Sequence, residues 1–182
     1  VLAKLSLDLK ARNIVLTIAL IAAFIIFSTL IKLNSLEQIP NFSYSGRKIL
    51  NVPFAKQKPW FCSEASASMV LQYYGFNLTQ DQINSMGYDR FEVMEPLMNQ
   101  YVNCIHKSVS LEEVKKEIDE GDPVMIRILA GPYLHTVVIV GYDGDHFIVH
   151  DPAQGPYIKV EIKRIIGQWR STNYDSMIFN PR

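Results

Sequence analysis

A β-hairpin predicted at residues 135–151 constrains the fold more than any other feature of the chain. Residues 135–141 and 146–151 are both rich in β-branched and apolar side chains, which is typical of strands. The pair Asp143-Gly144 between them is a turn signal, and Pro152 ends the second run because proline cannot donate to a strand ladder. We therefore expect two antiparallel strands joined by a tight turn.

The register of this hairpin decides which polar side chains meet. A three-residue loop with Gly144 in the left-handed conformation places His135 opposite Asp151, with Cβ atoms about 5 Å apart. Both residues then lie at the open end of the apolar face, whereas His146 and His150 point to the other face. A two-residue Asp-Gly turn shifts the register by one residue and separates the pair, so the prediction depends on the loop type.

A cysteine at a predicted helix start supplies a candidate nucleophile. The irregular residues 56–61 lead into residues 62–74, where small and apolar side chains recur at helical spacing and Gly75 follows as a C-terminal glycine. Cys62 therefore opens a helix, where unpaired N–H groups and the helix dipole favour the thiolate. Gln57, just upstream, is placed to donate a hydrogen bond to an oxyanion beside Cys62. A lone cysteine there is more often a small buried hydrophobic residue, and only the hairpin favours the catalytic interpretation.

The order of these residues resembles a known peptidase family. Residues 52–57, Cys62, residues 69–75, 135–142 and 151–155 are similar to motifs of the papain-like peptidases that remove double-glycine leaders in bacteriocin exporters, especially their stand-alone relatives. The resemblance covers the chain from Leu50 to Phe179. It implies an α+β papain-like fold, in which a helical part carrying the cysteine packs against an antiparallel sheet carrying the histidine and the aspartate.

The resemblance also implies a role for each candidate residue. Cys62 is the expected nucleophile, His135 the base, Asp151 the residue that orients the base, and Gln57 the oxyanion donor. Such a site cleaves peptide bonds through an acyl-enzyme. An amidase or acyltransferase with the same step and a non-catalytic peptide-binding module are the alternatives. The complete set of four residues argues against the binding module, because a binding module needs no thiol.

Two positions depart from the family pattern. Ser63 follows the cysteine where the family often has a glycine, and Phe61 stands where a polar residue is common. These differences leave the chemistry intact but leave the subsite shapes, and any double-glycine preference, open. Nothing in the sequence resembles a nucleotide-binding cassette, so the resemblance does not imply a role coupled to an exporter.

The N-terminal part predicts a membrane anchor. Residues 13–31 carry no charge and, at 1.5 Å per residue, reach about 28 Å, enough to cross a bilayer. The span is too long for a signal-peptide core, and no small-residue cleavage pattern follows it. A buried core helix is the alternative, but a small domain cannot cover a helix that is apolar all round. Lys4, Lys10 and Arg12 precede the span and only Lys32 follows it closely, which favours a cytoplasmic N-terminus and an extracytoplasmic catalytic domain.

These patterns predict four segments and their partners. The segments are a cytoplasmic N-terminus at residues 1–12, a transmembrane signal anchor at 13–33, a stalk at 34–49 and a papain-like peptidase domain at 50–182. The expected partners are a peptide or protein substrate and the lipid bilayer. The 18 Lys and Arg residues balance 18 Asp and Glu residues, so we expect no nucleic acid partner. We find no Cys/His set with metal spacing and expect no cofactor.

The remaining candidates are interpreted as structural. A disulfide between Cys104 and Cys62 would remove the nucleophile, so Cys104 is expected to be a buried free thiol. No sequence pattern places a carboxylate near His106. A Ser-x-x-Glu capping box at Ser110 predicts a helix over residues 110–118, and residues 79–87 predict another.

Overall fold

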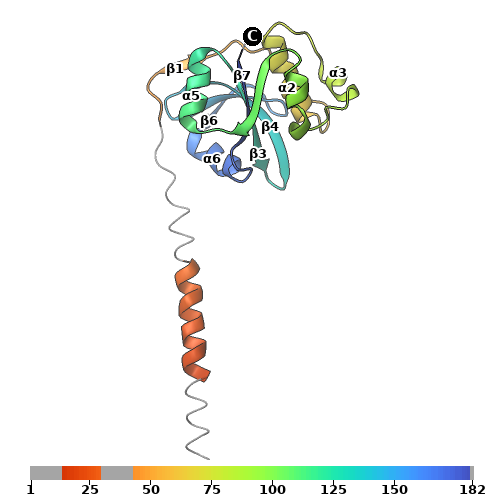
Figure 1. The fold of residues 1–182 in the computed structure, drawn as a ribbon. Helices are drawn as coiled ribbons and strands as arrows, with labels where there is room; N and C mark the ends of the chain where they lie inside the picture. Colours follow the sequence, from red (N-terminus) through yellow and green to blue (C-terminus); the bar gives the residue numbers. More distant parts are fainter. Residues whose placement is uncertain (1–13, 30–42, 181–182) are drawn as a thin grey trace, which may run out of the picture. The chain divides into compact units, whose positions relative to one another are not determined.

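The computed structural model describes residues 14–29 and 43–180 (Figure 1). The chain divides into two compact units, Val1–Pro40 and Asn41–Arg182. In the first unit residues 14–29 are helical, with mostly exposed side chains. No helix among the described residues has both the length and the apolar character that crossing a membrane requires. The predicted N-terminus at 1–12 and most of the predicted stalk lie outside the described residues. The predicted anchor at 13–33 lies partly outside them.

The second unit is a seven-stranded antiparallel sheet with helices packed around it (Figure 1). The strand order is β2-β7-β3-β4-β5-β6, and β1 pairs with β4. This architecture confirms the predicted α+β class with an antiparallel sheet. In chain order the elements are β1 (Arg47–Ile49), α2 (Cys62–Tyr73), α3 (Gln80–Ser85), the 3-10 helix η1 (Phe91–Val93), α4 (Glu95–Met98), β2 (Asn103–Ser108), α5 (Leu111–Glu120), β3 (Val124–Ala130), β4 (Tyr133–Asp143), β5 (His146–Asp151), β6 (Gly155–Glu161), α6 (Ile162–Arg170) and β7 (Asp175–Asn180).

Caps in the sequence determine where two of the helices begin. At α5, Ser110 accepts a hydrogen bond from the backbone N–H of Glu113, but the Glu113 carboxylate contacts Lys107. The reciprocal capping box lies at α3, where Thr79 and Gln82 each accept from the other's backbone N–H. The predicted helices are therefore present, with the two-sided box at the first of them.

The β4–β5 hairpin differs from the prediction at its turn. The turn residues are Gly144 and Asp145, so that Asp143 pairs with His146. Gly144 has a φ of 59°, which supplies the left-handed conformation that a two-residue hairpin turn needs at this position. The predicted three-residue loop is therefore wrong. The alternative Asp-Gly turn is also wrong, because the turn lies one residue later.

A β-bulge then brings the two strands to a register that suits the predicted pair. The register shifts between Ile139 and Gly141, so that Ile139 pairs with Val149. Beyond the bulge odd-numbered residues of β4 are opposite odd-numbered residues of β5, and His135 and Asp151 consequently share one face of the sheet. They meet diagonally rather than as directly opposed residues. The shared face is confirmed, and the direct opposition is wrong.

Close approach of β1 to β4 explains the glycine that ends the apolar run. A Cβ atom on Gly141 would lie 2.3 Å from the carbonyl oxygen of Lys48. Only glycine fits at this position. The contact continues as Leu50 donates its N–H to the Val140 carbonyl at 2.8 Å, which fixes the start of the loop leading to α2.

Helix α2 docks on β4 through small polar side chains. Residues 63–71 are all buried, and Ser63 Oγ lies 3.0 Å from Thr136 Oγ1, while Ser66 Oγ donates to the Thr136 carbonyl at 3.3 Å. The small side chains let the helix backbone come close to the strand, as the sequence predicts. Because side chains alternate along a strand, His135 and Val137 point to the other face, where they and residues of α6 line a common pocket.

Candidate active site

Cys62 is the first residue of α2 and is half-buried. Burial raises the pKa of its thiol, but hydrogen bonds with His135 and Thr136 and the charge of His135 outweigh burial, and the net pKa is lowered. A protonated imidazole beside the thiol thus favours ionisation of the thiol. This is the environment predicted for a cysteine at a helix start with a histidine partner.

His135 connects the thiol to the carboxylate of Asp151. Its Nε2 donates to Asp151 Oδ1 at 2.8 Å, which leaves Nδ1 as the ring nitrogen available to Cys62. Burial would lower the pKa of His135, but hydrogen bonds and charge from Asp151 and Cys62 raise it to about 9. At neutral pH the imidazole is therefore protonated, and its positive charge favours the thiolate of Cys62.

Asp151 is held by the backbone of the turn that follows it. Oδ1 also accepts from the N–H of Ala153 at 2.8 Å and of Gln154 at 3.2 Å, and Oδ2 accepts from the Gln154 side chain at 2.6 Å. Burial would raise the pKa of Asp151, but His135 and these N–H groups lower it. A carboxylate fixed in this way also fixes the plane and the tautomer of the ring that it contacts.

Gln57 lies on a loop that is attached to the Asp151 turn. Its backbone N–H donates to the Pro152 carbonyl at 2.9 Å. Gln80 of α3 holds both neighbours of Gln57, since it accepts from the N–H of Lys58 at 2.8 Å and donates to the carbonyl of Lys56 at 2.9 Å. The structure thus brings the segments of all four predicted residues together. Gln80 could not be predicted from the sequence, because no local pattern links α3 to this loop.

His150 is excluded from proton transfer by its hydrogen bonds. Nε2 donates to the Val52 carbonyl at 2.9 Å, and Nδ1 accepts from the Tyr157 N–H at 3.0 Å. The side chain is fully buried, and burial lowers its pKa. Both ring nitrogens are used by a neutral imidazole, so the ring is structural.

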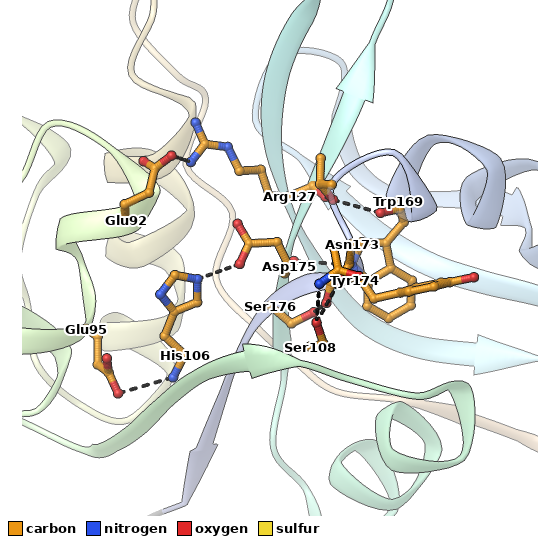
Figure 2. A network of polar contacts seen from close by, with 11 residues as sticks. Glu92, Glu95, His106, Ser108, Arg127, Trp169, Asn173, Tyr174, Asp175 and Ser176 are labelled. Atoms are coloured by element: carbon orange, nitrogen blue, oxygen red, sulfur yellow. Dashed lines mark hydrogen bonds and ion pairs between the residues drawn. The ribbon is translucent and has the colours of Figure 1, made fainter.

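A second His–Asp pair lies in the polar network drawn in Figure 2. His106 Nε2 is 2.5 Å from Asp175 Oδ1, and the His106 N–H donates to Glu95 at 3.2 Å. No local pattern predicts this carboxylate, because Asp175 is brought to His106 by the long-range pairing of β2 with β7. Cys104, two residues away, is buried as expected, and burial together with Glu95 raises its pKa to about 12.

A pocket of about 160 Å³ opens beside His135 and Asp151. Its other lining residues come from β3 to β6 and α6; they are Ile128, Ala130, Val137, Val149, Gln154, Ile158, Lys159, Val160, Arg164, Ile165 and Gln168. Among residues 14–29 and 43–180, no group of three or more His, Cys, Asp and Glu side chains is arranged to hold a metal ion.

Comparison with known proteins identifies the class of the molecule. The model of the Peptidase_C39 like family matches residues 49–177, and the chain belongs to this family. It is accordingly a cysteine peptidase, as the resemblance of its motifs implies. The comparison with curated protein sequences finds no match.

Solved structures share the fold at low sequence identity. A C39-like peptidase candidate from Bacillus anthracis has a TM-score of 0.67 and 20% identity, covering 76% of this chain and 99% of that one. A double-glycine-motif protease from an AMS/PCAT transporter, solved with the leader peptide, has a TM-score of 0.59 and 22% identity, covering 78% and 99%. The peptidase domain of Streptococcus ComA, a bifunctional ABC transporter, has a TM-score of 0.59 and 14% identity, covering 74% and 98%.

Proposed function

We propose that this peptidase hydrolyses peptide bonds with Cys62 as nucleophile, His135 as acid and base, Asp151 as orienting carboxylate and Gln57 as oxyanion donor. The observation that carries the proposal is the hydrogen-bonded series in which Asp151 holds His135 and His135 lowers the pKa of Cys62. A thiolate beside an imidazolium combines a strong nucleophile with a proton donor. Both are needed to break an amide.

In the first half of the reaction the Cys62 thiolate attacks the carbonyl carbon of the substrate. The carbonyl electron pair moves to oxygen, and the oxyanion accepts hydrogen bonds from the Cys62 backbone N–H and the Gln57 side chain. The His135 imidazolium then gives its proton to the amide nitrogen. The C–N bond breaks, the amine leaves, and the acyl group stays on Cys62 Sγ as a thioester.

In the second half His135 is neutral and acts as a base. It takes a proton from water, and the resulting hydroxide attacks the thioester carbonyl. The C–S bond breaks with return of the thiolate, the acid product leaves, and the imidazolium is restored. Asp151 stabilises the imidazolium in both halves and holds the ring so that Nδ1 faces the thiol.

Peptides are the substrate class that the comparisons favour. The double-glycine-motif protease that shares this fold was solved with a leader peptide. The pocket beside His135 is lined by both aliphatic and polar side chains, and Lys159 and Arg164 are among the polar ones. Such a mixed surface can contact both the side chains and the backbone of a polypeptide.

A digest of a synthetic peptide library in ¹⁸O-labelled water tests the proposal. The domain should generate new C-termini that carry ¹⁸O, because water resolves the acyl-enzyme. Cys62→Ala should abolish cleavage, and the matched variant Cys104→Ala should retain it. Cleavage by Cys62→Ala would contradict the assignment of the nucleophile. Products extended by an added amine, without ¹⁸O, would point to an acyltransferase instead.

We also propose that residues 13–33 anchor the protein in a membrane, with the peptidase domain outside the cytoplasm. The support is the uncharged run at residues 13–31, the basic residues before it, and the exposed apolar side chains of the helix at residues 14–29. Protease added to intact cells should digest the domain. Complete protection, or recovery of the full chain without membranes, would contradict this placement.

A further inference from the structure

Two large aromatic side chains face each other at the edge of the candidate active site. Trp60 is 78% exposed and Tyr133 is 60% exposed. Their ring centroids are 5.7 Å apart, with an interplanar angle of 67°, which is an edge-to-face contact. No role is assigned to either residue in the mechanism above.

The pair connects the segment of the thiol to the strand of the base. Trp60 precedes Cys62 by two residues, and Tyr133 precedes His135 by two residues on the same face of β4. Ala130, which pairs with Tyr133 in the β3–β4 ladder, lines the pocket beside His135. The two rings are therefore placed by residues that are close in the chain to the thiol and to the base, and by a strand pair that reaches the pocket.

The backbone conformation of Trp60 is strained, so the exposed position of its ring has a cost in conformational free energy. Its φ is 71°, in the left-handed region, which is strained for a bulky side chain. The ring is exposed, so burial in the free protein gives little to offset this strain. A strained residue that presents a large apolar surface beside a nucleophile is typical of a substrate contact.

We propose that Trp60 and Tyr133 form an aromatic bridge that packs against the acyl half of a polypeptide substrate, the half that remains on Cys62 Sγ. The inference rests on the proposed function. The acyl half is assigned because residues 57–62 carry both the thiol and the oxyanion donor, so the acyl group must lie along this segment. Aromatic rings with free faces pack well on peptide planes and on apolar side chains.

The two tryptophans of the chain allow a direct test. Trp60 is exposed, whereas Trp169 is fully buried and serves as an internal reference. Acetyl-Ala-Ala-Ala chloromethyl ketone alkylates a reactive thiolate: the C–S bond forms, the C–Cl bond breaks and chloride leaves. The reagent thus attaches a tryptophan-free peptide to Cys62 on the acyl side. Iodoacetamide labels the same sulfur with a much smaller group that carries no peptide.

The peptidyl adduct should shift tryptophan emission to shorter wavelength and reduce acrylamide quenching at least twofold, relative to the iodoacetamide adduct. The Trp60→Phe variant should show neither change. A fully labelled protein whose emission does not differ between the two adducts would overturn the aromatic bridge and leave the proposed function standing. Failure of both reagents to label Cys62 would overturn the proposed function, and the bridge with it.

Two substitutions of Trp60 distinguish the effect of its backbone strain on stability from the effect of its proposed substrate contact on activity. Trp60→Gly relieves the left-handed strain, so its unfolding midpoint should equal or exceed that of Trp60→Ala, while both should lower kcat/KM at least fivefold. Phe76→Ala, which removes another partly exposed aromatic pair at the far end of α2, is the matched control and should change kcat/KM less than twofold. Wild-type kcat/KM in both Trp60 variants would contradict the proposal.

Discussion

Among the residues that the structure describes, two His–Asp pairs join different strands and have a cysteine nearby in the fold or the chain. His135 and Asp151 are 2.8 Å apart on β4 and β5, and His106 and Asp175 are 2.5 Å apart on β2 and β7. The contacts between imidazole and carboxylate are alike. The cysteines are not, because the pKa of Cys62 is lowered and that of Cys104 is raised to about 12.

The difference lies in what surrounds each thiol. Cys62 is the first residue of a helix, is half-buried and hydrogen-bonds with His135. Hydrogen-bond donors and a positive charge therefore stabilise its thiolate. Cys104 is buried within a strand and has the Glu95 carboxylate near it, which disfavours a second negative charge. A His–Asp pair is therefore not by itself a catalytic signature. The position of the thiol decides which pair can do chemistry.

Removal of the carboxylate from each pair should give the largest contrast between the two regions. Asp151→Asn should lower kcat about 10³- to 10⁴-fold, because the amide can donate to Nε2 and favour the wrong tautomer, and because the negative charge that stabilises the imidazolium is lost. Asp175→Asn should leave kcat within twofold but lower the free energy of unfolding by about 1–2 kcal/mol, as expected for a weakened, partly buried hydrogen bond. Turnover assays and urea unfolding measure the two effects. A tolerated Asp151→Asn with an inactive Asp175→Asn would reverse the assignment.

The pH profile of kcat/KM should depend on Cys62 and the His135–Asp151 pair, and not on Cys104 and the His106–Asp175 pair. Activity needs the thiolate of Cys62 and the proton of His135, so it should rise at a pH below the ordinary range of a thiol and fall above pH about 9. Asp151 raises the pKa of His135, and the residual activity of Asp151→Asn should therefore fall at lower pH. A profile that still rises beyond pH 9 would contradict the ionic pair.

A smaller effect is expected at the loop that carries Gln57, the proposed oxyanion donor. Gln80→Ala removes the hydrogen bonds to the backbone on both sides of Gln57, and kcat should fall about three- to tenfold with KM little changed. Asp81→Ala removes only an exposed ion pair with Lys58 and is the matched control, with less than a twofold effect. Equal effects of the two variants would refute a positioning role for Gln80.

Local patterns in the sequence predict those structural features that depend on residues close together in the chain. The start of α2 at Cys62, the hairpin strands and the face shared by His135 and Asp151 follow from period, turn residues and strand alternation. The register of β4 and β5 does not follow from these local patterns, because the bulge at Val140 and the close approach of β1 to Gly141 are tertiary effects. The same reason explains why the partner of His106 and the role of Gln80 were missed. Both depend on contacts between segments that are distant in the chain.

The rate of alkylation of the two thiols as a function of pH tests the central claim most directly. Iodoacetamide labelling followed by mass spectrometry should show that Cys62 reacts faster than an ordinary thiol near pH 7, with a rate that rises less steeply from pH 7 to 8.5. The same measurement on His135→Ala should show a slower rate that rises about tenfold per pH unit, as for an ordinary thiol. Cys104 should stay unlabelled in the folded protein. Equal rates for the two thiols, or a Cys62 profile unchanged by His135→Ala, would contradict the account.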